Sequence, residues 1–433
     1  MKNSEYTAAL VGLWGAWVSS PACSSDDLAV ARQTGALGHE HHQQGGHEPA
    51  RDKRGPHELV VDAHIHLWDL PRFIANPGAG DTLLEQIAPA YSGDPNLPDE
   101  LRTSTLHDGG GFPDQCCPSQ ATGYQSSWTT PDPASNWLIH DYLVSDYDAT
   151  PGGRQVDKII LIESTLDPSQ TVQGNKWMLD LVAASDQLYS YVGNMDPTAD
   201  QGTFDGWLAE LGANNLLVGI RVPNGIWDTQ AGNLGATSIA NIDKLVALGI
   251  SVLEAPDDAP TGLIVGLATH WPSAKIVVDH DGGRNHDFLP DPSWEARLTE
   301  ISAKRNVYVK VSDITRWNEA EQGAEFTTPY NSSTDVSKYL PALDVLYTKF
   351  GADRLLWGSN WPVSDTAGRG GPKEGGTDTI NIQLALTKEW LDSKPEGARR
   401  KILGLNSLHV YHPRSKEECS RAATLFGRTH GKG

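Results

Sequence analysis

Eight short runs of β-branched and aliphatic residues recur along this chain, and segments with helical character separate them. This alternation is typical of parallel strands joined by helical crossovers. Eight parallel strands can close into a ring, so the sequence predicts an α/β fold, a (β/α)8 TIM barrel. The predicted strands are residues 59–62, 158–162, 189–192, 217–220, 251–253, 275–278, 307–310 and 355–357, and two of the predicted helices are 137–147 and 241–248.

Two long segments interrupt this pattern. Residues 71–134, rich in Gly, Pro, Ser and Asp, follow the first predicted strand, and residues 317–335 follow the seventh. Segments that leave the carboxyl ends of barrel strands lie at the mouth of the barrel. We therefore expect both insertions to act as lids.

The amino-terminal residues 1–22 have the pattern of an export signal. Lys2 precedes an apolar stretch, and small residues stand before Cys23. The same segment resembles a lipoprotein box, so acylation of Cys23, which would anchor the chain to a membrane, stands beside simple cleavage. The predicted location is secreted, periplasmic or cell-envelope, with the cytoplasm as the second choice.

Composition divides the rest of the chain into three parts. Residues 23–57 are predicted to be a flexible, disordered His/Gly-rich linker, and residues 58–412 form the barrel. Residues 413–433 are polar and basic, and we expect a solvated tail. The linker histidines either stay solvated or wrap a transition metal; they are His39, His41, His42 and His47.

The net charge restricts the partners. The chain carries 34 Lys and Arg against 55 Asp and Glu, a formal charge of −21 at pH 7. A phosphate backbone or an anionic membrane surface would be repelled by this excess. Nucleic acid is therefore excluded as a partner, a small-molecule substrate is expected, and the oligomeric state is not indicated.

Cysteine is scarce. Once Cys23 is set aside, Cys116, Cys117 and Cys419 remain. Neighbouring cysteines suggest a soft-metal site, but no C-x-x-C pair supports one. A disulfide from Cys116 or Cys117 to Cys419 is the favoured interpretation.

Two histidines mark the end of the first predicted strand. In the segment from Asp62 to Trp68, His64 and His66 alternate with apolar residues. The two-residue period of a strand places both imidazoles on one face, where they could hold a divalent cation or clamp an oxyanion. An H-x-H pair alone is weak evidence in a chain with 15 histidines.

Polar residues end the other predicted strands as well. Barrel enzymes place their catalytic groups at these positions. Taken singly, Glu163, Asp196 and Glu254 suit structural ion pairs or caps equally well. The polar residues at or after the strand ends are Glu163, Asp196, Arg221, Glu254, His280, Lys310, Ser312 and Asn360.

In these motifs the sequence resembles the amidohydrolase-related (amidohydrolase 2) family of the amidohydrolase superfamily. That family includes lactonases and metal-dependent decarboxylases of aromatic acids, and the lactonase-like branch fits best. The resemblance extends from Val60 to about Tyr411. It rests on residues 62–68, 219–221, 279–282, 309–312, 353–362 and 402–407.

The resemblance implies roles for individual residues. His64, His66 and His280 correspond to metal-binding or substrate-polarising histidines, and Arg221 would grip a substrate carboxylate. One divalent metal, zinc, is the implied cofactor, but lactonases of this branch also work without metal. Whether zinc binds here therefore stays open.

Asn360 departs from the family pattern. Many members have Asp in the motif Gly-Ser-Asp-Trp-Pro, and that Asp takes the proton of the attacking water. An amide cannot act as such a base. Either His280, Glu163 or Asp365 activates water instead, or the chain is a catalytically impaired binding protein, natural or engineered.

We therefore predict hydrolysis of a lactone or cyclic ester of a sugar acid or aromatic-degradation intermediate. His64 and His66 would polarise the carbonyl directly or through zinc, and His280 would position or deprotonate water. Substrate contacts are predicted from Arg221, Lys310, Glu163, Trp68 and Trp361, although ordinary packing explains the two Trp residues equally well. The alternatives are a zinc-dependent decarboxylase of an aromatic acid and the binding protein.

Overall fold

The computed structural model describes residues 58–67, 142–164, 171–283, 291–314, 336–366, 379–395 and 397–420, all within the unit Glu48–Gly433. The predicted export signal, the linker up to residue 57 and the two insertions 71–134 and 317–335 lie outside these residues. Trp68, Cys23, Cys116 and Cys117 lie outside them too.

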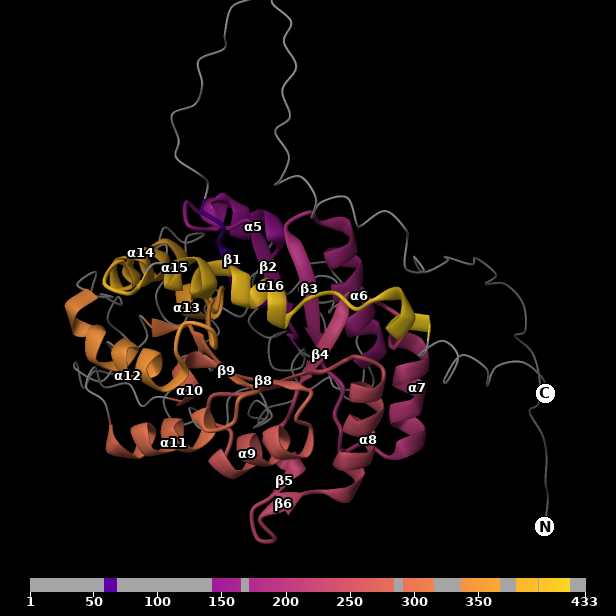
Figure 1. Cartoon of the computed structure of the whole chain (residues 1–433). Coiled ribbons are helices and arrows are strands. Elements are labelled where there is room, and N and C mark those ends of the chain that lie inside the picture. The colour runs from indigo at the N-terminus through magenta and orange to yellow at the C-terminus, as the bar shows by residue number, and fades with distance from the viewer. Residues whose placement is uncertain are drawn as a thin grey trace, which may run out of the picture. The chain divides into compact units, whose positions relative to one another are not determined.

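The predicted barrel is confirmed. One sheet contains eight parallel strands in the order β1-β2-β3-β4-β7-β8-β9-β10, and Figure 1 shows helices packed around it. The strands are β1 Val61–Ile65, β2 Lys158–Ile162, β3 Leu188–Gly193, β4 Leu217–Arg221, β7 Val252–Ala255, β8 Lys275–Val278, β9 Val307–Val311 and β10 Leu355–Trp357.

The helices that the structure describes connect or follow these strands. They are α5 Val144–Ala149, α6 Thr171–Ala184, α7 Gln201–Leu211, α8 Ala236–Ala247, α9 Thr261–His270, α10 His280–Gly283, α11 Pro292–Ser302, α12 Leu340–Phe350, α13 Val363–Thr366, α14 Thr379–Asp392, α15 Ala398–Arg400 and α16 Asn406–Val410. Within the described ranges, no helix combines the length and the apolar character that crossing a membrane would require.

Hydrogen bonds close the ring between its first and last strands. The Asn360 backbone N–H donates to the His64 carbonyl (2.9 Å), and the His66 N–H donates to the Trp361 carbonyl (2.8 Å). Ile65 and Trp361 form a parallel bridge at the same place. The segment that follows β10 therefore pairs with β1 at the residues that carry the H-x-H pattern.

The inner face of the ring changes character along the strands. Val252 and Val277 belong to a buried apolar cluster that also contains Tyr411. Two residues further along the chain stand Glu254 on β7 and Asp279 directly after β8, both fully buried. Because side chains alternate along a strand, the same face is apolar at its amino end and polar at its carboxyl end.

Some expectations about the elements need correction. The first strand spans Val61–Ile65 rather than 59–62, so His64 lies inside it. Helix α8 begins at Ala236, five residues before the predicted start, and a small antiparallel hairpin precedes it, made of β5 Trp227–Asp228 and β6 Asn233–Leu234. The sequence did not predict this hairpin because each of its strands has only two residues.

Within the described part of the expected solvated tail, Ser415, Lys416 and Glu417 are exposed, but Arg414 and Cys419 are buried. Arg414 is 6% exposed, and its guanidinium donates to the carbonyls of Leu217 (2.9 Å), Leu248 (2.9 Å), Gly212 (2.8 Å) and Asn214. A basic residue near a chain end can thus be buried when backbone carbonyls saturate its donors. Residues 421–433 lie outside the described part of the chain.

Candidate active site

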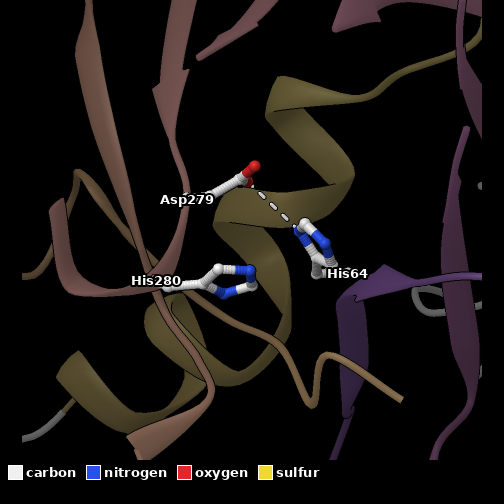
Figure 2. A group of neighbouring side chains, drawn as sticks. All are labelled: His64, Asp279 and His280. Carbon is white, nitrogen blue, oxygen red and sulfur yellow. Dashed lines mark ion pairs between the residues drawn. The ribbon is translucent and has the colours of Figure 1, made fainter. Parts of the chain in front are cut away.

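The three predicted histidines meet at the carboxyl end of the barrel. The Nε2 atoms of His64 and His66 lie 2.9 Å apart. The His280 ring centroid lies 4.7 Å from that of His64, although the two residues are far apart in the sequence (Figure 2). His64 is fully buried and His66 is nearly so.

Asp62 holds the backbone around His64 in place. One carboxylate oxygen accepts from the backbone N–H of His64 (3.1 Å) and of Ser359 (2.9 Å), and the other accepts from the Tyr147 hydroxyl (2.8 Å). Burial raises the pKa of Asp62, and its hydrogen bonds offset only part of that effect. Asp62 therefore joins β1, the segment after β10 and α5.

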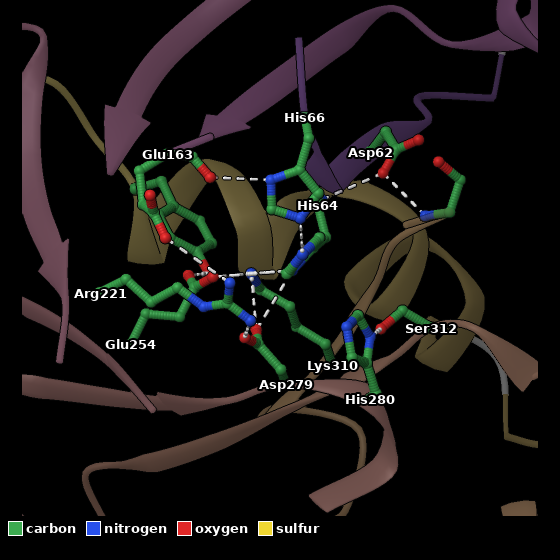
Figure 3. Close-up of polar contacts among 12 residues, drawn as sticks. Asp62, His64, His66, Glu163, Arg221, Glu254, Asp279, His280, Lys310 and Ser312 are labelled. Carbon is green, nitrogen blue, oxygen red and sulfur yellow. Dashed lines mark hydrogen bonds and ion pairs between the residues drawn. The ribbon is translucent and has the colours of Figure 1, made fainter. Parts of the chain in front are cut away.

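A buried ammonium group lies beneath the histidines. The Nζ atom of Lys310 is 2.6 Å from Glu254 Oε1, 2.8 Å from His64 Nδ1 and 3.2 Å from Asp279 Oδ1 (Figure 3). The Lys310 side chain is fully buried, and Nζ also lies 5.7 Å from the centre of the Tyr411 ring. The Tyr411 hydroxyl donates to Glu254 Oε2 at 3.0 Å.

The two carboxylates beside Lys310 differ in their affinity for protons. Burial and the negative charge of Asp279 raise the pKa of Glu254 to about 8. Burial also acts to raise the pKa of Asp279, but Lys310, His64 and Arg221 together hold it well below its usual value. Asp279 is thus the permanent anion of this pair.

A directed chain of hydrogen bonds runs through the two strand histidines. His66 Nδ1 lies 2.8 Å from the Glu163 carbonyl, which can only accept, so Nδ1 carries the proton. In a neutral ring His66 Nε2 then accepts from His64 Nε2–H. His64 Nδ1 is left with a lone pair, which accepts from Lys310.

Both rings are neutral in this arrangement. Burial lowers the pKa of His66 to about 3, and the positive charge of Arg221 contributes. Burial, followed by the charge of Lys310, lowers the pKa of His64 well below its usual value. The proton positions derived from the hydrogen-bond acceptors therefore agree with the lowered pKa values of both rings.

The His280 hydrogen bond is separate from the bonds that link His66, His64 and Lys310. The Nδ1 atom of His280 lies 2.9 Å from Ser312 Oγ. His280 and Asp281 both have positive φ, 39° and 56°, at the tight turn after β8. Such values are costly for residues other than glycine and are found where surrounding structure fixes a functional group. The turn aims the His280 ring at His64.

Arg221 and Glu163 are the more accessible charged groups of the site. Their side chains are 23% and 14% exposed and lie 3.6 Å apart, and Arg221 also pairs with Asp279 at 3.0 Å. Both are partly exposed, unlike the fully buried Asp279. Lys310 has no exposed surface, so its position does not support the predicted contact with substrate.

Asn360 and Trp361 follow β10. Asn360 has a φ of 58°, which Asn tolerates, and among the described residues its buried Oδ1 has no hydrogen-bond partner. Trp361 is 2% exposed and packs edge-on against Tyr142 and Tyr147. Core packing therefore accounts for Trp361, and Trp68 lies outside the described residues.

Asp196 stays away from this group. It is exposed, and its carboxylate accepts from the Thr198 backbone N–H at 2.8 Å, as in a turn. Of the alternative bases, Glu163 lies in the site, whereas the side chain of Asp365 lies outside the described residues.

Sequence reasoning did not single out Asp279 or Tyr411. Asp279 lies next to His280 in the motif at residues 279–282. Because it follows Val277 by two residues, strand alternation could have predicted that its side chain lies on the inner face of the barrel. No local pattern marks Tyr411, because only the folded chain brings it to Glu254.

The donor types suit a metal, but the contacts do not. Within the described part, His64, Asp279 and His280 have ligand atoms within 4.8 Å of one another. Lys310 already lies against both His64 Nδ1 and Asp279 Oδ1, and the hydrogen-bond direction places a proton on His64 Nε2. A dication here would meet an ammonium group, so the residues as arranged do not fit zinc.

Comparisons with known proteins agree with this architecture. A family model described as "Amidohydrolase" matches residues 61–412. An L-fucono-1,5-lactonase of Burkholderia ambifaria is 25% identical over 279 residues, which cover 63% of this chain and 86% of that protein. A second L-fucono-1,5-lactonase, from Burkholderia multivorans, is 25% identical over 139 residues, 31% of this chain and 40% of that protein.

Solved structures show the same fold. An amidohydrolase from Burkholderia multivorans with bound HEPES superposes with a TM-score of 0.54 at 17% identity. A crystal form of the amidohydrolase with bound zinc superposes with a TM-score of 0.53, also at 17% identity. In both cases the match covers 82% of this chain and 100% of the other.

Proposed function

Because this chain belongs to the amidohydrolase family, we propose that it is a hydrolase that opens a lactone or a related cyclic ester. The observation that carries the proposal is the meeting of neutral His64 and His66, His280 and the accessible Arg221 at the carboxyl end of the barrel. The similarity to L-fucono-1,5-lactonases favours lactones of sugar acids over those of aromatic-degradation intermediates.

The proposed chemistry uses His280 as the base. If Nδ1–H donates to Ser312, Nε2 keeps a lone pair and can take a proton from water. The water oxygen then attacks the lactone carbonyl, and the oxygen that develops negative charge is stabilised by the Arg221 guanidinium. When the ring C–O bond breaks, the departing alkoxide takes the proton back from His280.

A panel of lactones tests this proposal directly. The purified protein is assayed against 1,5-lactones of sugar acids, a pyrone-type lactone and simple esters, with and without a chelator. We expect turnover of at least one sugar-acid lactone, unchanged by the chelator. Failure on every lactone and ester would overturn the proposal.

His280→Gln provides the matched variant. Loss of a positioned base should lower kcat by about 100-fold or more while the fold is kept. His270→Gln on α9 is the control, because His270 is an exposed histidine outside the site. Equal activity of H280Q and wild type would remove His280 from the mechanism.

The second candidate is a binding protein without catalysis, and Asn360 is the observation that favours it. We expect Asn360→Asp to change the lactonase kcat by less than about tenfold, since His280 and not residue 360 is the proposed base. If wild type were inactive but stabilised thermally by a lactone, and N360D gained turnover, the binding protein would be favoured. Release of carbon dioxide from an aromatic acid would favour the decarboxylase.

Export of the chain and acylation of Cys23 stay predictions. Membrane partitioning of wild type against Cys23→Ser in cells would test the anchor.

A further inference from the structure

The contacts of Lys310 are those of a bound cation. Its Nζ lies within 3.2 Å of three acceptors from distant parts of the chain: His64 Nδ1 on β1, Glu254 Oε1 on β7 and Asp279 Oδ1 directly after β8. An imidazole nitrogen and two carboxylate oxygens are also a common donor set for zinc. All four side chains are fully buried.

From this geometry we propose that Lys310 is a resident cation that occupies the place of a divalent metal and sets the tautomer of His64. The inference deepens the proposed function, because it assigns Lys310 as a positioning residue for the same site. The ammonium group neutralises Asp279 and donates to His64 Nδ1, so the His64 proton is held on Nε2.

The tautomer matters because two groups compete for His64 Nδ1. Asp279 Oδ1 is 3.1 Å from this nitrogen, and Lys310 Nζ is 2.8 Å from it. With Lys310 present, Nδ1 accepts and Nε2 carries the proton toward His66. Without Lys310, the Nδ1 lone pair of His64 would remain beside the oxygens of Glu254 and Asp279, and these three atoms would become available to a metal in the place of the ammonium group.

Lys310→Met is therefore expected to create a metal site. The methionine side chain retains the apolar stem in a buried position and removes the positive charge. Zinc chloride alone is the ligand, and bound metal is measured by equilibrium dialysis with elemental analysis. We expect K310M to bind one equivalent of zinc, with an affinity about tenfold or more above that of wild type.

The control is Lys275→Met. Lys275 also lies on a barrel strand, β8, but its Nζ donates to the carbonyls of His409 and Val410 at the other end of the barrel. K275M should bind no more zinc than wild type. Lys310→Arg, which keeps the charge, should also exclude zinc.

A second measurement covers the case in which K310M does not fold. Nitrogen-15 spectra of histidine-labelled wild type should show His64 as the Nε2–H tautomer, assigned by comparison with His64→Gln. An Nδ1–H tautomer of His64, tight stoichiometric zinc in wild type, or no gain of zinc binding by folded K310M would each overturn the inference.

These outcomes separate the inference from the proposed function. If K310M gains zinc while wild type hydrolyses no lactone, the proposed reaction is wrong and the role of Lys310 stands. If wild type hydrolyses a lactone and K310M binds no zinc, the reverse holds.

Discussion

His66 shows how burial selects one protonation state at the scale of a single residue. Its side chain has fixed neighbours at both ring nitrogens, a carbonyl at Nδ1 and His64 at Nε2. A proton added to this ring would have to displace the His64 N–H and would lie near Arg221. The neutral form is therefore required for the folded arrangement.

This requirement predicts a pH dependence of stability. In the unfolded chain His66 takes up a proton near pH 6.5, whereas in the folded protein it does so only near pH 3. The unfolded state therefore binds more protons between these values, and the free energy of unfolding falls as the pH falls through this window. The contribution is at most about 1.4 kcal/mol per pH unit.

Urea unfolding of wild type and His66→Gln at pH 7, 5.5 and 4 measures the effect. The difference between the two proteins should shift in favour of H66Q as the pH decreases, because Gln takes up no proton. His270→Gln, at an exposed position, should follow the wild-type profile. Parallel profiles for H66Q and wild type would contradict the derived protonation state.

At the scale of elements, the closure between β1 and the segment after β10 depends on Asp62. Two backbone N–H groups and one hydroxyl converge on its carboxylate, all of them buried. Backbone pairing at His64 and His66 adds two further bonds across the same closure. The backbone pairing that completes the ring therefore also positions His64 and His66 of the candidate site.

Asp62→Ala should lower the free energy of unfolding by about 3 kcal/mol or more, because buried donors would lose their acceptor. Tyr147→Phe removes one of the three bonds and should cost about 1 kcal/mol. Denaturant unfolding checks both values. Similar small effects of the two substitutions would show that the closure does not depend on the Asp62 carboxylate.

For the whole molecule, the segment after α16 completes the opposite end of the barrel. Arg414 donates to carbonyls that follow α7 and α8 and to one at the start of β4. Its own backbone N–H donates to Asn215 at 2.9 Å. Distant parts of the chain are thus joined by one guanidinium group.

We expect Arg414→Ala to lower the free energy of unfolding by roughly 3 kcal/mol, since several buried carbonyls would lose a charged donor. Arg414→Lys should give an intermediate loss, because one nitrogen cannot match the planar fork of arginine. Arg305→Ala, at an exposed position, should change stability by less than about 0.5 kcal/mol. A loss in R414A no larger than in R305A would contradict this role.

The sequence by itself determined the class of fold and the histidines of the site. Eight apolar runs with helical segments between them indicated the barrel, and polar residues at the strand ends indicated its mouth, because both patterns are local and periodic. His64, His66 and His280 were found in this way, and so was the departure at Asn360.

Only the tertiary structure decided what each polar group contacts. It placed Lys310 among Glu254, Asp279 and His64 rather than in reach of solvent, and it brought Tyr411 and Arg414 into the core. The physical reason is that charge balance in a buried site is a property of contacts between distant residues. Spacing along the chain cannot show which ammonium group neutralises which carboxylate.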